Sequence, residues 1–92
     1  MPIMLGFIDK EKIALEDLGV ALKTNRKRRG DTQADAADRC GVSRETYRKM
    51  EQGNPGAGIG NWVRAIRLYG EIDQLETLFP TSLFDRSTGT KR

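Results

Sequence analysis

The stretch from Thr32 to Gly53, TQADAADRCGVSRETYRKMEQG, decides the fold. Thr32 is followed three residues later by Asp35, which has the form of a capping box and predicts a helix that begins here and stops at Gly41. Ser43 is a preferred N-cap residue and predicts a second helix, which ends near Gly53. Because glycine adopts a positive φ without strain, Gly41 suits the very short turn between the two helices.

Two short helices across a tight glycine turn form a helix-turn-helix unit, whose second helix enters the major groove of DNA. Ala37 is small where the two helices cross, and the positions that would pack them together are all apolar: Ala36, Cys40, Val42, Tyr47 and Met50. The residues left outside on the second helix can reach bases or phosphates: Arg44, Glu45, Arg48, Lys49 and Gln52.

Three further helices are predicted around this unit, which makes the chain an all-α bundle of five helices. The first covers about residues 10–29, stops at Gly30, and has an apolar face made of Ile13, Leu15, Leu18 and Leu22. The fourth covers about residues 60–69 and places on one face Trp62, Ile66 and Tyr69. The fifth is capped by Asp73 and closed by Pro80, and it turns inward Leu75, Leu78 and Phe79.

Both ends of the chain are predicted to lie outside a folded domain at residues 10–80. Residues 1–9 form an N-terminal arm, in which the apolar stretch Met1–Ile8 is either a short strand or a loose segment. That stretch is too short for a signal peptide or a membrane span, so no membrane partner is expected. Residues 81–92 form a flexible tail with a disordered end, in which Leu83 and Phe84 could dock on the body.

The composition excludes several classes of site. With 92 residues the chain is one domain, and it contains no histidine and a single cysteine, Cys40. Zinc sites, Cys–His and Ser–His–Asp nucleophiles and an imidazole base are therefore absent, so we expect no enzyme, no metal and no cofactor. A lone cysteine cannot form an internal disulfide, which predicts an intracellular, cytoplasmic protein.

The positive charge lies in the middle of the sequence. The whole chain has a net charge of +3, whereas residues 23–52 alone carry nine basic and five acidic residues. The densest run is Lys23–Arg29, KTNRKRR. Two interpretations of this run stay open: the cations offset the dipole at a helix C-terminus, or they form a patch that faces phosphates.

Residues 32–53 resemble the lambda-repressor-like, XRE-class helix-turn-helix family, on the pattern Thr32-Gln33, Ala37, Gly41-Val42-Ser43-Arg44-Glu45-Thr46 and Glu51-Gln52-Gly53. The resemblance extends over about residues 18–79. It implies five helices, double-stranded DNA as the ligand, and a homodimer on a near-palindromic operator. It also implies a structural ion pair between Arg26 in the first helix and Glu51 at the end of the recognition helix.

The sequence departs from the family pattern in two places. Tyr47 replaces an aliphatic residue in the recognition helix, so we expect looser packing there or a hydrated hydroxyl group. Glycines replace the Ser or Thr that caps the fourth helix, which weakens any side-chain phosphate contact there. Within the family, the Gly-Asn-Pro-Gly sequence at Gly53 and the Trp-bearing fourth helix resemble the HipB-like antitoxins that pair with HipA-type kinases.

The predicted base contacts are Arg44, Lys49 and Glu45. Arginine and lysine match the O6 and N7 acceptors of guanine, and a glutamate accepts from the amino group of cytosine. Glu45 has an equally weighted alternative, in which it favours the helix dipole and touches no base. The predicted phosphate contacts are Gln33, at a helix start with free N–H groups, and Ser43, Thr46, Arg48, Gln52 and Asn54.

These features predict a sequence-specific DNA-binding transcriptional regulator, a repressor of its own operon, that reads an operator half-site with residues 44–52. The alternative is an antitoxin that binds and neutralises a HipA-type kinase and represses its operon as a secondary role. The apolar residues Ile3, Met4, Leu5, Phe7 and Ile8 could serve a dimer or such a partner.

Overall fold

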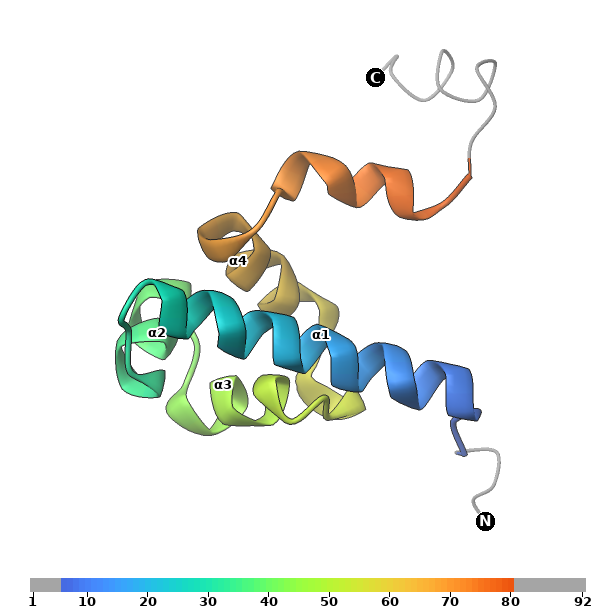
Figure 1. The fold of residues 1–92 in the computed structure, drawn as a ribbon, viewed down its shortest axis with the longest axis horizontal. Helices are drawn as coiled ribbons and strands as arrows, with labels where there is room; N and C mark the ends of the chain where they lie inside the picture. Colours follow the sequence, from blue (N-terminus) through green and yellow to red (C-terminus); the bar gives the residue numbers. More distant parts are fainter. Residues whose placement is uncertain (1–5, 81–92) are drawn as a thin grey trace.

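The computed structural model describes residues 6–80, which fold into helices packed around one small core (Figure 1). The α-helices are α1 (Asp9–Arg28), α2 (Gln33–Cys40), α3 (Arg44–Glu51) and α4 (Ile59–Tyr69). Two segments are 3₁₀ helices, η2 (Pro55–Ala57) and η3 (Ile72–Leu78). The all-α class is confirmed, with η3 as the fifth main helix and no strand within the described part of the chain. Residues 1–5 of the predicted arm (1–9) and the predicted tail at residues 81–92 lie outside the described residues, while residues 6–8 form no strand and Asp9 begins α1.

Local sequence signals set the helix ends, as predicted. The capping box is present: Asp35 N–H donates to Thr32 Oγ1 at 3.0 Å, and Thr32 N–H donates to Asp35 Oδ2 at 3.1 Å. Gly41 has a φ of 74° and ends α2 in the left-handed conformation that only glycine adopts freely. Ser43 Oγ accepts the N–H of Thr46 at 3.1 Å and caps α3. The α2–turn–α3 unit is therefore held by its own short-range hydrogen bonds.

The core lies where α2 and α3 meet α1 and α4. Its buried residues come from all four α-helices and from η2: Leu22, Ala36, Ala37, Cys40, Tyr47, Met50, Ala57, Trp62 and Ala65. The residues predicted to pack the helix-turn-helix unit are thus buried, with Val42 partly buried against them. At Gly19, α1 passes so close to the end of α3 that an added Cβ would overlap the carbonyl oxygen of Glu51.

The predicted apolar face of α1 is wrong in part. Ile13 is 56% exposed and Leu18 is 42% exposed, whereas the buried line of the helix passes through Gly19, Leu22 and Arg26. Ile13 and Leu15 are separated by about 200° around a helix, since each residue adds about 100°. The two side chains therefore cannot lie on the same face.

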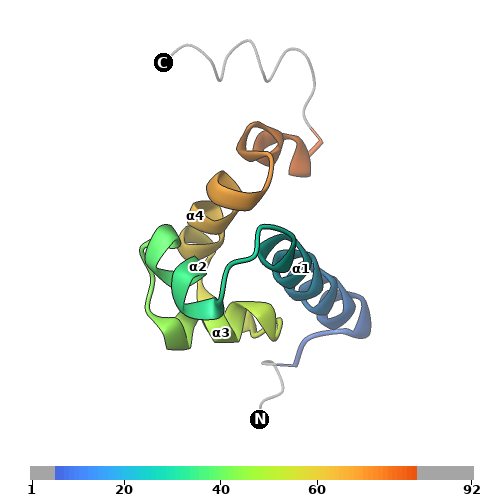
Figure 2. The ribbon, with the colours of Figure 1, turned by 60° about the vertical axis from the view of Figure 1, so that its left-hand side comes forward.

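The fifth helix also differs from the prediction. The segment starts at Ile72, Asp73 lies within it and caps nothing, and η3 contains no buried residue. Leu78 and Phe79 are 69% and 77% exposed instead of turned inward. Figure 2 shows η3 beyond the end of α4 and away from α3. The fifth helix therefore does not close the bundle as expected.

Candidate nucleic-acid interface

The α3 helix has one buried face and one polar face. Tyr47 and Met50 have no exposed area, so they fix the orientation of the helix on the core. The opposite side presents the side chains predicted for DNA: Arg44, Glu45, Arg48, Lys49 and Gln52, of which Lys49 is the only one partly buried. Because α3 is held by fully buried side chains, its polar side chains project from a fixed helix axis.

Glu45 lies between two cations on this face. Its Oε2 is 3.8 Å from Arg48 Nη2 and 4.0 Å from Lys49 Nζ, and the three side chains are 45–66% exposed. Exposed pairs of this kind are worth less than about 1 kcal/mol, so each can exchange for a contact with DNA. Arg44 forms no salt bridge within residues 6–80, which leaves its guanidinium group available for a ligand.

Arg26 and Glu51 form the ion pair that the family resemblance implies. Arg26 Nε donates to Glu51 Oε2 at 2.6 Å, and the two side chains are 9% and 3% exposed. Burial alone would raise the pKa of Glu51, but the hydrogen bonds from Arg26 and Gln33 outweigh it, so the pKa of this carboxyl lies below its usual value. Glu51 is therefore ionised at neutral pH and belongs to the scaffold of α3.

Gln33 is tied to the same carboxylate. Its Nε2 donates to Glu51 Oε1 at 2.9 Å, and the side chain starts α2 in a half-buried position. An amide nitrogen carries two hydrogens, so one remains for a phosphate together with the free backbone N–H groups of the helix start. The Glu51 carboxylate thus positions Gln33, the residue predicted to contact a phosphate.

The small polar residues predicted for phosphates have structural partners. Ser43 Oγ donates to Thr46 Oγ1 at 3.0 Å while it accepts the Thr46 N–H, which uses both functions of the Ser43 hydroxyl. Asn54 Oδ1 accepts the N–H of Gly56 at 2.7 Å and starts η2. The Thr46 hydroxyl hydrogen and the Asn54 amide group remain as donors. Their contact with phosphate stays a prediction.

Sequence reasoning missed two hydrogen bonds that tie α4 to the rest of the fold, one to the end of the Lys23–Arg29 run and one to the turn between α2 and α3. Arg29 Nη2 donates to the Leu68 carbonyl at 3.0 Å, and its guanidinium carbon lies 5.4 Å from the centre of the Tyr69 ring. Arg64 Nη1 donates to the carbonyl of Gly41 at 2.6 Å, on the turn itself. Since Arg26 is buried as well, the exposed cations of the Lys23–Arg29 run without such partners are Lys23, Lys27 and Arg28.

A second hydrogen-bonded group joins α4 to the loop before α2. Tyr69 Oη donates to Asp31 Oδ2 at 2.7 Å, and Arg39 Nη2 lies 3.5 Å from Asp31 Oδ1. Burial, followed by the bond to Asp31, raises the pKa of the Tyr69 phenol. No local pattern marks Asp31 as a partner of a tyrosine 38 residues away, so the packed fold was needed to find it.

The Tyr47 hydroxyl is shielded from bulk solvent, contrary to the expectation from the sequence. It is fully buried and forms no hydrogen bond of good geometry among residues 6–80, although it lies close to the Glu51 carboxylate. Burial raises the pKa of this phenol far above its ordinary value. The aromatic ring fills the core beneath α3.

Other chemistry finds little support in the described residues. No three His, Cys, Asp or Glu side chains come together there as metal ligands, and no helix among them has the length and apolar character to cross a membrane. The Cys40 thiol is buried, and its burial raises the pKa of the thiol. A buried, protonated thiol is a core group and a poor nucleophile.

The family model described as a helix-turn-helix domain matches residues 17–78. The match begins within α1, includes the whole α2–turn–α3 unit and extends to the last residue of η3. No curated protein and no solved structure matches the chain.

Proposed function

We propose a function from one premise: the chain belongs to the helix-turn-helix domain family. A domain of this family makes it a DNA-binding regulator. We propose further that it is a repressor of the XRE class that recognises a specific operator and acts on its own operon.

One observation supports recognition of bases by α3. Arg44 is exposed and unpaired within residues 6–80, while Tyr47 and Met50 beneath it are completely buried. A rigid helix with a free guanidinium group near its N-terminus suits the major groove, where an arginine bonds O6 and N7 of guanine. Lys49 and Glu45 lie on the same exposed surface and would contact neighbouring base pairs.

The residues around α3 suit contacts with the DNA backbone. Arg48 and Gln52 are exposed on α3, and Gln33 presents an amide hydrogen beside the free N–H groups at the start of α2. Helix N-termini bind phosphates because their N–H groups and dipole favour negative charge. Thr46 and Asn54, which keep free donor hydrogens, complete the proposed set of phosphate contacts, and Ser43 would join them by giving up its bond to Thr46.

We propose that two copies bind together to a near-palindromic operator. Dimers of helix-turn-helix domains place two recognition helices on half-sites separated by about 34–36 Å, one turn of DNA. A second candidate function is an antitoxin that binds a HipA-type kinase. The exposure of Phe7 (44%) and Ile8 (61%) ahead of α1 favours a protein partner at this end of the chain.

The experiment is a binding isotherm of the purified chain on DNA from upstream of its own gene, repeated at several salt concentrations. With about three to five phosphate contacts per half-site, log K should fall against log salt with a slope near −0.9 per contact. Operator DNA should be bound at least about 1000-fold more tightly than random duplex. Equal affinity for both duplexes would contradict the repressor, and a pull-down of a kinase from the same operon would then favour the antitoxin.

A further inference from the structure

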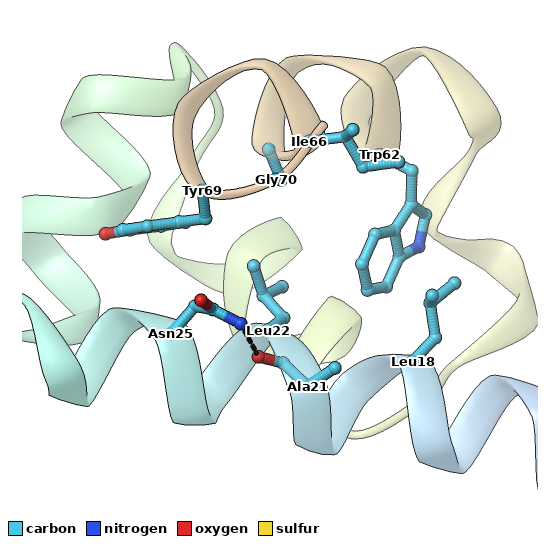
Figure 3. A pocket seen from close by; sticks show the side chains of 9 residues that line it. Leu18, Ala21, Leu22, Asn25, Trp62, Ile66, Tyr69 and Gly70 are labelled. Carbon is cyan, nitrogen blue, oxygen red and sulfur yellow. Dashed lines mark hydrogen bonds between the residues drawn. The ribbon is translucent and has the colours of Figure 1, made fainter. Parts of the chain in front are cut away.

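An apolar groove lies between α1, α4 and η3, on a part of the molecule that includes no residue of α2 or α3. It has a volume of about 560 Å³, and its apolar lining includes Leu15, Leu18, Trp62, Ile66, Leu75 and Leu78. A smaller pocket of about 100 Å³ between α1 and α4 shares the residues Leu18, Trp62 and Ile66 (Figure 3). Groove and pocket therefore form one continuous apolar surface.

Nothing within residues 6–80 covers this groove. Leu18, Ile59 and Leu78 are 42%, 74% and 69% exposed, and η3 contributes no buried residue. In a 3₁₀ helix residues three apart lie above one another, so Leu75 and Leu78 form one stripe, and both line the groove. A contiguous apolar groove with a polar rim is a candidate surface for an interaction.

The charge around the groove indicates a basic occupant. Residues 71–80 contain three acidic residues and no basic one, and the N-terminal half of α1 adds Glu16 and Asp17. A second copy docked here about a two-fold axis would bring these acidic segments against each other, because such an interface uses the same patch twice. Like charges across an interface are unfavourable.

The segment that follows Pro80 has the required chemistry. Leu83 and Phe84 are an apolar pair, and residues 81–92 carry three basic residues against one acidic residue. Leu78 already lines the groove, and five residues span at most about 17 Å from there to Leu83. That length allows the chain to turn back over the groove after Pro80.

We propose that Leu83 and Phe84 of the same chain fill the groove, with the basic residues after them facing the acidic rim. The connection to Pro80 makes this an intramolecular contact, with an effective concentration of the order of millimolar for a short linker. The docked segment covers Leu18, Ile59 and Leu78 and completes the core on the side that η3 leaves open. The groove contains no residue of α2 or α3, and of the proposed DNA contacts it includes Asn54 alone.

The test compares four chains: the full chain, a truncation after Pro80, a truncation after Arg86 that retains the apolar pair, and the double variant Leu83→Ser, Phe84→Ser. A dye that fluoresces in apolar sites, anilinonaphthalene sulfonate, reports the open groove, and circular dichroism confirms that each chain is folded. We expect increased dye fluorescence in the truncation after Pro80 and in the double variant. The truncation after Arg86 is the matched control: it keeps the apolar pair and Arg86, loses Lys91 and Arg92, and should show dye fluorescence close to that of the full chain.

Nuclear Overhauser contacts between the Phe84 ring and the methyl groups of Leu18 or Ile66 provide the direct measurement. They should be present in a uniformly labelled sample and absent from the intermolecular spectrum of mixed labelled and unlabelled chains. Equal dye fluorescence in all four chains would overturn the proposal. Contacts found only in the mixed sample would overturn it as well, since they would assign the groove to a second copy.

Discussion

The Arg26 guanidinium holds the Glu51 carboxylate with two of its nitrogens, Nε to Oε2 at 2.6 Å and Nη2 to Oε1 at 3.2 Å. Its third nitrogen, Nη1, donates to the carbonyl of Asp31 at 2.9 Å. One side chain therefore joins α1, the loop before α2 and the end of α3. Gln33 adds a third hydrogen bond to the same carboxylate, so the recognition helix and the start of α2 share one buried anchor.

The first prediction is that Arg26→Met lowers the free energy of unfolding by about 3–5 kcal/mol, because it leaves the buried Glu51 carboxylate without its partner. Urea denaturation measures this. The matched control is Arg28→Met, at an exposed position, for which we expect a change within about 0.5 kcal/mol. Arg29→Met should fall between the two, since Arg29 bonds the Leu68 carbonyl at the surface. Equal losses of stability in Arg26→Met and Arg28→Met would contradict the role of Arg26 as a buried anchor.

The same pair predicts how stability depends on pH. The folded pKa of Glu51 is below its ordinary value of 4.5, so the carboxylate stabilises the fold above pH 4.5. That contribution is lost as the pH falls from 4.5 through the lowered folded pKa. We expect the free energy of unfolding of the native chain to fall more steeply with acid than that of Glu51→Gln. The pKa of Asp35 is also lowered by its bonds to Thr32, but Asp35 titrates in both chains, so its contribution cancels in the comparison. Parallel curves would contradict this prediction.

Two glycine-to-alanine substitutions should change the stability of the chain in opposite directions. Alanine is favoured over glycine in a helix by about 1 kcal/mol, and Gly60 in α4 has open space around an added Cβ. We expect Gly60→Ala to raise the melting temperature. At Gly19 the Cβ would overlap the Glu51 carbonyl and stand 3.0 Å from the Gly53 nitrogen, both backbone groups. Gly19→Ala should therefore cost roughly 1–3 kcal/mol. An increase in melting temperature for both would show that α1 and α3 do not pack this closely.

Tyr47→Phe should leave the chain at least as stable as it is. A buried hydroxyl without a hydrogen bond costs about 1–3 kcal/mol, and phenylalanine removes it while it retains the ring. Thermal unfolding followed by circular dichroism measures the difference. Tyr47→Ala serves as the contrast, with an expected loss of about 3–5 kcal/mol from the cavity. A loss above about 1 kcal/mol for Tyr47→Phe would mean that the hydroxyl bonds a neighbour such as Glu51.

Short-range signals were the part of the fold that could be predicted from the sequence. The capping box of Thr32 and Asp35, the left-handed Gly41 and the Ser43 cap each involve residues at most three apart, so local chemistry determines them. The polar face of α3 follows from the same helix period. The ion pair of Arg26 and Glu51 came from the family resemblance, because no local pattern joins residues 25 apart.

The features that escaped prediction depend on how the helices pack. The bond from Arg64 to the Gly41 carbonyl spans 23 residues and that from Arg29 to Leu68 spans 39, so each exists only in the folded chain. The exposure of Leu78 has a similar origin. Its spacing correctly marks an apolar stripe, but η3 turns that stripe toward an open groove and not toward the core. A periodic pattern specifies which residues share a face and leaves open what covers that face.

The last prediction separates recognition of bases from attraction to the backbone. Arg44 is exposed at the start of α3, where it would contact a base, whereas Arg28 is exposed at the end of α1 and would meet phosphate charge alone. We expect Arg44→Ala to cost about 1–3 kcal/mol on the operator and to weaken discrimination at one base position. Arg28→Ala should weaken operator and random duplex by similar factors and reduce the salt slope by about one contact. The measurement is a set of isotherms for both variants on operator, single-base variants and random duplex.

If Arg44→Ala lowers all affinities equally, Arg44 binds phosphate and the assignment of base recognition is wrong. If it changes no DNA affinity but abolishes binding to a protein partner, the exposed face of α3 is a protein interface and the repressor proposal fails.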